Sequence, residues 1–266
     1  MRARAAAALL AATAALSARA DPRPLEWDLR RDGALTAGAA ILWISSELAK
    51  EHLAPATCRF CGVNRLDARA RELLVWGYGD HARGGSDLFA FALLPAGIAT
   101  HQLLAARADG DAQEGFVDLL IIAEAAALSM DLNQIVKFSV GRQRPFVRYG
   151  NWRDPDRAPD PDDNLSFYSG HTALAFSMAA AAGTVSDLRG YRSAPWIWGA
   201  GLTLAATVGY LRIAADRHYL TDVLTGAVLG AAAGVALPRL MHGRKDGGEG
   251  TTASVTAVPL GVVVVF

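Results

Sequence analysis

Six long apolar segments constrain this chain more than any other feature. They are separated by polar stretches and cover residues 34–49, 88–106, 116–136, 172–188, 195–214 and 220–240. Each is long for a strand, and several approach the ~20 residues that a helix needs to cross a bilayer. Aromatic residues make up only 8% of the chain, so the hydrophobicity comes from Ala, Leu and Val, which suit close helix packing. The sequence therefore predicts an all-α protein, a helical bundle of about six helices embedded in a membrane.

The length of 266 residues favours one domain with extensions at both ends. We expect a signal peptide over 1–20, a helical and loop extension over 21–84, the bundle over 85–241, and a Gly-rich linker with an extended tail over 242–266. Polar residues such as Glu124 interrupt the apolar segments. Because a charge is costly in lipid, we expect such residues to be buried against protein.

The first twenty residues have the composition of an export signal. Arg2 and Arg4 precede an apolar run, and Ala18 and Ala20 form the A-x-A pattern of a cleavage site. An uncleaved N-terminal anchor is the alternative. Either interpretation places the chain in the bacterial cell envelope, as an inner-membrane protein whose active site faces the periplasm or as a soluble periplasmic protein.

The distribution of basic residues predicts an orientation in the membrane. If the leader is cleaved and segment 34–49 does not cross, the remaining five segments place residues 137–171 outside the inner membrane. Other basic residues then lie on the inner side, as the positive-inside rule prefers. These are Arg189, Arg192, Arg239, Arg244 and Lys245.

Two cysteines, Cys58 and Cys61, lie close together in a chain that we expect to be exported. An oxidising compartment allows such a pair to form a local disulfide. A redox-active pair would sit in a strand-helix-strand pattern, which these residues lack, and a zinc site would need outside ligands such as His52 or His81. We therefore predict a structural disulfide and no metal site.

Three clusters of polar residues lie at the ends of apolar segments. The first contains Lys137, Arg144 and Pro145. Arg144 is seven positions after Lys137, so one continuous helix would place both on one face, and Pro145 would help to end it. Taken alone, this cluster could equally be a basic helix end that reaches lipid headgroups.

The second cluster, Ser169-Gly170-His171, directly precedes an apolar segment. We expect Ser169 to cap that helix, whose first backbone N–H groups would face a bound anion. Gly170 lets the backbone approach a ligand closely, and His171 can protonate a departing alkoxide near neutral pH. The alternative is an ordinary helix start beside a surface histidine.

The third cluster contains Arg212, His218 and Asp222. His218 and Asp222 are four residues apart and can meet on one helical face. If Asp222 accepts the Nδ1 proton, Nε2 keeps its lone pair outward, as a nucleophilic or metal-binding histidine requires. A plain helical His–Asp pair is the alternative.

Together the clusters resemble the signature of the type 2 phosphatidic acid phosphatase superfamily, which also includes bacterial acid phosphatases and vanadium haloperoxidases. The family pattern is Lys, six residues, Arg-Pro; then Pro-Ser-Gly-His; then Ser-Arg, five residues, His, three residues, Asp. Every spacing matches here. Tyr168 stands where the family usually has Pro and Leu211 where it usually has Ser, and neither change removes a group that the chemistry requires. The resemblance covers roughly residues 85–241.

The resemblance implies an anion site made by residues of all three clusters. Lys137, Arg144 and Arg212 would bind the phosphate oxygens, assisted by Ser169 and by the Gly170 amide. Charge complementarity supports the same assignment.

The resemblance also implies catalytic roles for three further residues. His218 would attack phosphorus to give a phosphohistidine, His171 would protonate the leaving oxygen, and Asp222 would stabilise the charged His218. No cofactor is expected, because clustered cations would repel a divalent metal ion.

The sequence thus predicts a metal-independent phosphatase that hydrolyses a phosphate mono- or diphosphate ester, most naturally of a membrane lipid. A vanadium-dependent haloperoxidase and a soluble periplasmic non-specific acid phosphatase are the alternatives that share this site. A serine hydrolase using Ser169 would need the G-x-S-x-G elbow, which the sequence lacks. The expected partners are a phosphorylated lipid or a small phosphate ester and the membrane, and not a nucleic acid; a non-catalytic lipid-binding bundle is a further alternative.

Overall fold

The computed structural model describes residues 23–150, 158–244, 254–258 and 261–265, so the expected leader lies outside the described residues. The longer helices are α2 (Leu29–Leu48), α4 (Arg65–Leu74), α5 (Gly79–Leu88), α6 (Leu94–Asp109), α7 (Ala112–Val140), α9 (Gly170–Arg189), α10 (Ala194–Ala214) and α11 (Leu220–Met241). Shorter elements are α3 (Lys50–Leu53), the π-helical turn η1 (Phe89–Leu93), α8 (Pro145–Arg148) and the 3-10 turn η2 (Pro161–Asn164). The strands β1 (Ser254–Val258) and β2 (Gly261–Val265) form an antiparallel hairpin.

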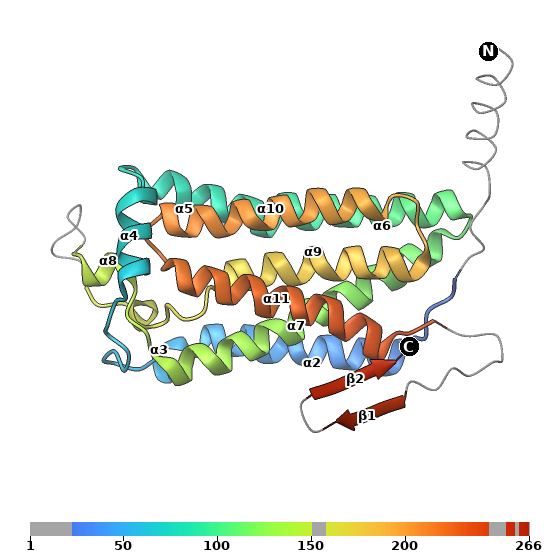
Figure 1. The fold of residues 1–266 in the computed structure, drawn as a ribbon, viewed down its shortest axis with the longest axis horizontal. Helices are drawn as coiled ribbons and strands as arrows, with labels where there is room; N and C mark the ends of the chain where they lie inside the picture. Colours follow the sequence, from blue (N-terminus) through green and yellow to red (C-terminus); the bar gives the residue numbers. More distant parts are fainter. Residues whose placement is uncertain (1–22, 151–157, 245–253, 259–260, 266) are drawn as a thin grey trace, which may run out of the picture.

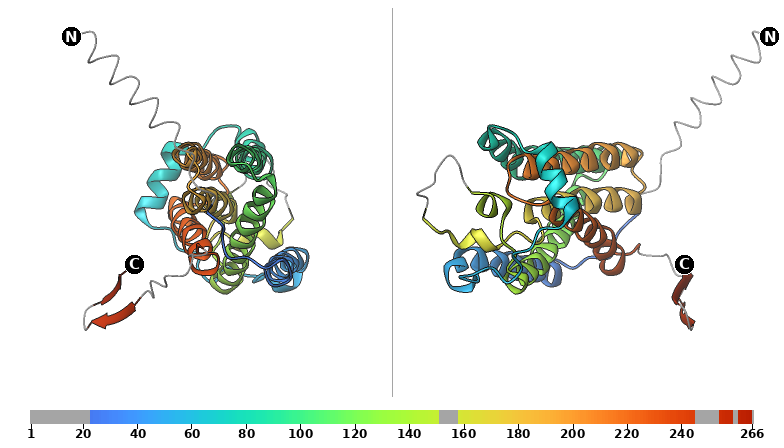
Figure 2. Two further views of the ribbon diagram at one scale, coloured as in Figure 1. Left: turned by 90° about the vertical axis from the view of Figure 1, so that its right-hand side faces the viewer. Right: turned by 60° about the vertical axis from the view of Figure 1, so that its left-hand side comes forward.

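Six long helical units pack side by side in the described part of the chain, with α5, η1 and α6 forming one of them (Figure 1). Helix α9 lies at the centre and contacts α6, α7, α10 and α11, and the end-on view in Figure 2 shows it surrounded by other helices. Most side chains of α9 are small and buried. The predicted all-α bundle of about six helices is confirmed.

Close packing of α9 on α11 depends on glycines. A Cβ atom on Gly230 or Gly234 would lie 2.4 Å from a backbone oxygen of α9, that of Ala173 or Ser177. Small residues at such spacing let two helix backbones come together, a common arrangement in membrane bundles. The contact brings the first turns of α9 and α11 together, where the Ser169 amide donates to the Asp222 carbonyl at 3.1 Å.

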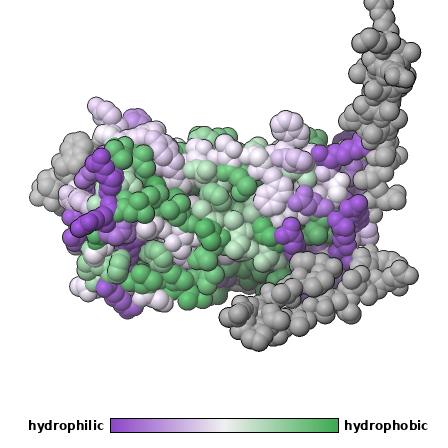
Figure 3. Space-filling model, viewed as in Figure 1, coloured by the Kyte–Doolittle hydropathy of each residue, from purple (hydrophilic) through white to green (hydrophobic). Residues whose placement is uncertain are grey.

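Three helical units are long and apolar enough to cross a membrane: Gly79–Asp109, Ala194–Ala214 and Leu220–Met241. Large apolar side chains on them face outward, including Phe91, Trp196 and Val228. Figure 3 shows these surfaces as a hydrophobic band with polar residues gathered toward both ends of the bundle. The polar residue Glu124, by contrast, is buried inside the bundle, as predicted.

The N-terminal segment lies at the end of the bundle opposite residues 137–171. Leu25 forms a β-bridge with Arg244, and α2 then runs along α7 (Figure 1). At that end His242 contacts the Glu26 carbonyl oxygen through Nδ1 and Glu124 through Nε2. The predicted orientation with five crossing segments required the start of the mature chain and residues 137–171 to lie on the same side of the membrane. The structure does not meet this requirement, because the polar contacts of His242 hold the N-terminal segment at the opposite end of the bundle.

Candidate active site

A cavity of about 140 Å³ lies at the end of the bundle where residues 141–169 connect α7 to α9. It is lined by Trp43, Glu47, Lys50, Phe91, Met130, Lys137, Arg144, Asp162, Gly170, His171, Leu174, Arg212 and His218. Six of the eight predicted catalytic and phosphate-binding residues are therefore brought together from α7, α8, α9, α10 and the turn before α11. Ser169 and Asp222 are not among the lining residues.

Lys137 and Arg144 reach the cavity from different elements. Helix α7 ends at Val140 because Gly141 takes a left-handed conformation, with φ of 59°, which favours glycine. Arg144 is the N-cap residue of α8, in extended conformation. The prediction that both cations share one continuous helix is wrong, because the helix stops before Arg144 and well short of a proline-induced end.

The Arg144 guanidinium is anchored by backbone carbonyls. Its Nε donates to Asp162 O at 2.7 Å and its Nη1 to Arg217 O at 3.3 Å. The same Nη1 lies 3.4 Å from Nε2 of His218. Arg144 thus places a fixed positive charge beside the imidazole that we predicted as nucleophile.

A carboxylate that sequence reasoning missed, Asp87 on α5, contacts two predicted site residues. Its Oδ1 lies 2.8 Å from His171 Nε2 and 3.5 Å from Arg212 Nη1. Arg212 Nη1 also donates to Ser86 Oγ at 2.9 Å, while its buried Nε finds no acceptor among the described residues. The only sequence signal for Asp87 was its position directly before an apolar segment.

Gly170 has a steric role at the first turn of α9. A Cβ atom there would lie 2.9 Å from Asn133 Oδ1 and 3.0 Å from Lys137 Nζ. A side chain at this position would displace the ends of Asn133 and Lys137, so glycine lets the Lys137 ammonium lie against the N-terminus of α9, where backbone N–H groups also favour an anion.

Ser169 occupies the N-cap position of α9, but its side chain forms no hydrogen bond to the helix backbone. Its Oγ instead pairs with Thr172 Oγ1 at 2.9 Å. The position of the helix start is as predicted, whereas capping by the Ser169 hydroxyl is wrong, because the Thr172 hydroxyl is its partner.

His218 is almost completely buried, and its Nδ1 lies 2.8 Å from the Ser166 carbonyl oxygen. Because a carbonyl oxygen can only accept, Nδ1 carries the proton, and the Nε2 lone pair lies on the cavity side with Arg144 Nη1 3.4 Å away. The nearest oxygen of Asp222 is farther from Nδ1, at 3.8 Å. The predicted tautomer is therefore supported by Ser166, whereas the predicted hydrogen bond from Nδ1 to Asp222 is not formed, although the two residues lie within ion-pair distance.

The Asp222 carboxylate accepts hydrogen bonds from three donors other than the imidazole. Its Oδ2 accepts from Ser166 Oγ at 2.6 Å and from the Tyr219 amide at 2.9 Å, and its Oδ1 accepts from Arg142 Nη1. Asp222 thus contacts His218 indirectly: it binds the Ser166 hydroxyl, and the Ser166 carbonyl oxygen accepts from His218 Nδ1. Arg142, which lies between Lys137 and Arg144 in the sequence, was not predicted to take part.

The charges around the cavity alter the pKa values of two groups outside the long helices. Burial lowers the pKa of His218 well below its usual value, and Arg144, Arg212, Lys137 and His171 lower it further. The imidazole is therefore neutral at pH 7. Burial alone would raise the pKa of Asp162, but nearby cations outweigh this effect and hold it far below its usual range, so Asp162 is ionised.

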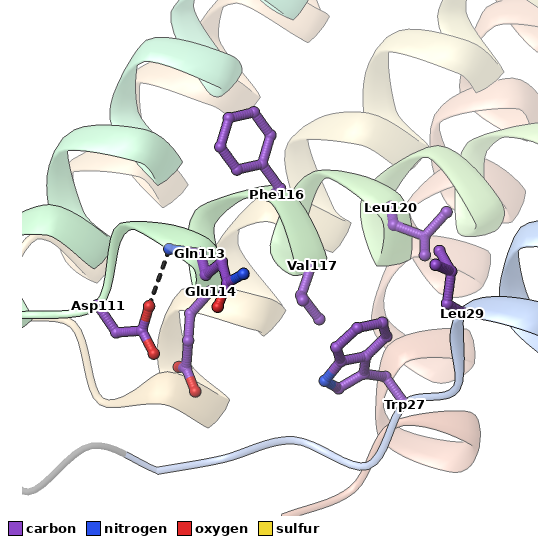
Figure 4. Close-up of a pocket in the computed structure, with 8 residues that line it drawn as sticks. All are labelled: Trp27, Leu29, Asp111, Gln113, Glu114, Phe116, Val117 and Leu120. Carbon is purple, nitrogen blue, oxygen red and sulfur yellow. Dashed lines mark hydrogen bonds between the residues drawn. The ribbon is translucent and has the colours of Figure 1, made fainter.

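A larger cavity, of about 460 Å³, lies near the start of α7 (Figure 4). Its lining within the described residues contains the carboxylates Asp111 and Glu114 but no histidine, lysine or arginine. Because two carboxylates repel an anion, this cavity does not suit a phosphate ester.

Asp32, Glu124 and His242 form a buried group close enough to share a cation, at the end of the bundle that holds Leu25. Asp32 there is already bound by Arg31 and by the Asp28 amide. Within the described residues, this group contributes nothing to the lining of the 140 Å³ cavity.

Comparison with known proteins identifies the family. Residues 118–246 match the model of the PAP2 superfamily, a range that contains all three clusters. This region of the chain belongs to the PAP2 superfamily. The predicted resemblance is confirmed for the PAP2 region, and residues before 118, including Asp87, lie outside the match.

One curated protein and one solved structure are similar to parts of this chain. The lipid A 1-phosphatase of Porphyromonas gingivalis is 37% identical over 98 residues, which are 37% of this chain and 18% of that protein. The matched segment therefore spans less than a fifth of the curated relative. The crystal structure of a transmembrane PAP2 type phosphatidylglycerolphosphate phosphatase from Bacillus subtilis is 19% identical, with a TM-score of 0.45, over 74% of this chain and 94% of that one.

Proposed function

We propose that this protein is a metal-independent phosphatase that hydrolyses a phosphate ester of a membrane lipid through a phosphohistidine intermediate. One observation carries the proposal. The Nε2 atom of His218 faces a cavity that Lys137, Arg144 and Arg212 share. Cations from three separate elements around one neutral imidazole suit a dianionic phosphoryl group attacked by nitrogen.

The reaction then proceeds in two balanced steps. The Nε2 lone pair of His218 forms a bond to phosphorus while the ester P–O bond breaks, and His171 gives its proton to the departing alkoxide. His171 next takes a proton from water, whose oxygen displaces His218 from phosphorus and releases inorganic phosphate. Cations around the phosphoryl oxygens stabilise the charge in both transition states.

A lipid substrate is supported by the apolar part of the cavity lining. Trp43, Phe91, Met130 and Leu174 lie beside the cationic residues, and the bundle carries an outward hydrophobic band (Figure 3). An apolar wall next to a phosphate site suits a molecule with a charged head and an apolar chain. The similarity to a protein named lipid A 1-phosphatase is consistent with such a substrate.

The proposed location is the inner membrane, with the cavity on the periplasmic side. Basic residues gather near the opposite end of the long helices, including Arg189, Arg192, Arg239 and Arg244. The positive-inside rule places that end in the cytoplasm. Because Leu25 lies at that same end, a cleaved leader, which would leave Leu25 outside, is not compatible with this placement, and the leader stays an untested prediction.

Release of inorganic phosphate from a panel of lipid and soluble phosphate esters, with a chelator present, tests the proposal. Wild-type protein should release phosphate from lipid substrates, and label from a ³²P-substrate should be trapped on His218. Halide oxidation that depends on vanadate and peroxide, without release of phosphate from any ester, would overturn it. Label on Ser169 or loss of activity with chelator would overturn the mechanism.

A further inference from the structure

We infer that Asp67, on helix α4 outside the PAP2 region, is a positioning residue for the proposed nucleophile: it holds Arg142, which holds Asp222 next to His218. The inference rests on the proposed function, because it assigns a role within that reaction. It is carried by a continuous series of buried hydrogen bonds that joins α4 to the His218 imidazole.

Asp67 is fully buried and has four hydrogen bonds from three residues. Its Oδ2 accepts from Arg142 Nη2, from Thr221 Oγ1 and from Asn64 Nδ2, each at 2.7 Å, and its Oδ1 accepts from the Thr221 amide at 2.9 Å. Thr221 directly precedes Asp222 in the sequence. One carboxylate therefore fixes both Arg142 and the first turn of α11.

Arg142 lies between two buried carboxylates. It is 3% exposed, and its Nη2 and Nη1 reach Asp67 and Asp222, both of which are 0% exposed. The rings of Tyr219 and Phe60 flank its guanidinium, with centroids at 4.2 Å and 5.4 Å. The guanidinium therefore forms an ion pair with a buried aspartate on each side.

The loop that contains Cys58 and Cys61 holds the other side of Arg142. The two cysteines form a disulfide, and between them the amides of Arg59 and Phe60 donate to the Gly141 carbonyl at 2.9 Å and 3.3 Å. The Gln143 amide donates back to Phe60 O at 3.2 Å. The loop closed by the disulfide is thus hydrogen-bonded to Gly141 and Gln143, the residues on both sides of Arg142. The disulfide therefore helps to fix the backbone that carries Arg142.

This arrangement has an electrostatic consequence for His218. Asp67, Arg142 and Asp222 together carry one net negative charge, and Asp222 also holds Ser166, whose carbonyl accepts the Nδ1 proton. A phosphorylated imidazole carries a positive charge that this net negative charge stabilises. Without the Asp67 charge, Arg142 would cancel Asp222 and the stabilisation would be lost.

Replacing Asp67 by Asn tests the role. Asp67→Asn should lower kcat about tenfold with little change in KM, because substrate contacts stay in place while the charged intermediate loses stabilisation. Glu72→Gln is the matched control, since Glu72 lies on the same helix in an exposed pair with Arg69. The control should keep wild-type kcat.

The pH dependence separates this role from a merely structural one. The charged and titratable groups that line the cavity with His218 are Glu47, Lys50, Lys137, Arg144, Asp162, His171 and Arg212, and Asp222 lies on the Nδ1 side of the imidazole. Removing a negative charge behind Asp222 lowers the pKa of His218, so the acid limb of kcat/KM should move to lower pH in Asp67→Asn. NMR of ¹³C-histidine-labelled protein reports the same shift without any turnover.

A double variant shows whether Asp67 acts through Arg142. Adding Asp67→Asn to Arg142→Met should cost little further activity, because the two residues work as one unit. If Asp67→Asn does not fold, Thr221→Val removes a hydroxyl that contacts both Asp67 and Arg142, and it should lower kcat at constant KM. Thr221→Val with wild-type kcat would then overturn the inference.

The outcomes separate this inference from the proposed function. If wild type and Glu72→Gln release no phosphate, the proposed function fails, and the NMR titration still decides whether Asp67 controls His218. A folded Asp67→Asn with wild-type kcat and an unchanged His218 titration overturns the inference alone.

Discussion

The PAP2 region supplies most of the side chains that line the cavity, and the residues before it supply carboxylates that hold some of these side chains and their neighbours. Residues 118–246 supply both histidines and three of the four lysine and arginine residues that line the cavity, Lys137, Arg144 and Arg212, whereas the fourth, Lys50, lies before them. The preceding residues supply carboxylates that hold those groups, Asp67 on Arg142 and Asp87 on Arg212 and His171. A buried cation is costly without a partner, so the signature residues also depend on carboxylates that lie outside the signature.

This difference predicts how strongly a substitution in each region should affect the reaction. In the proposed mechanism the signature residues that line the cavity contact the phosphoryl group, so replacing them should change binding or chemistry outright. Residues before it act through one intermediate side chain, so we expect smaller and more selective effects from them. The following predictions test this difference between the two regions.

The largest effect should come from His218→Ala, which removes the proposed nucleophile. Turnover should fall by roughly 10³-fold or more, measured as release of inorganic phosphate. Inhibitor binding gives the control, because the three cations still hold orthophosphate in the variant. Residual turnover within tenfold of wild type would remove His218 from its role.

His171→Ala and Asp87→Asn test one histidine–carboxylate pair, with His171 inside the PAP2 region and Asp87 before it. Loss of the proton donor in His171→Ala should slow alkyl esters about 100-fold and aryl esters, which have good leaving groups, far less. Asp87→Asn should give the same selectivity at about tenfold, because it acts only through the orientation of His171 and Arg212. Rates on both ester types measure this; equal losses on the two would contradict the assigned role.

Arg212→Ala removes one charged contact to the phosphate oxygens. Inhibition by orthophosphate should weaken about 10- to 100-fold, in line with a hydrogen bond to a charged group. Lys137→Met provides a comparison, since it removes a second cation from the same anion. Unchanged phosphate inhibition in Arg212→Ala would place the guanidinium outside the anion site.

The smallest effect should come from replacing Cys58 and Cys61 together by serine. Opening such a short loop should cost about 2 kcal/mol of unfolding free energy, because little chain entropy is regained. Thermal unfolding measures the loss, and kcat should change less than in Asp67→Asn since the backbone contacts to Gly141 persist. Reductant should reproduce the effect in wild type and leave the serine variant unaffected.

The helices and most of the site could be read from the sequence because their causes are local. Apolar runs such as 172–188 and 220–240 are too long for strands, and the spacing of Lys137, Ser169-Gly170-His171 and His218 placed the polar groups at helix ends. The disulfide followed from the closeness of Cys58 and Cys61. These patterns depend on neighbours within a few turns of chain.

The partners of the buried charged side chains could be seen only in the tertiary structure. The Asp67–Thr221 hydrogen bonds join residues 154 positions apart, and Asp87–His171 spans 84. Competition among distant donors turned Asp222 toward Arg142 and Ser166, and Gly141 separated Arg144 from the helix of Lys137. Periodicity reports which residues face inward, whereas the partner of a buried charge depends on which other segment packs against it, and that is a property of the whole fold.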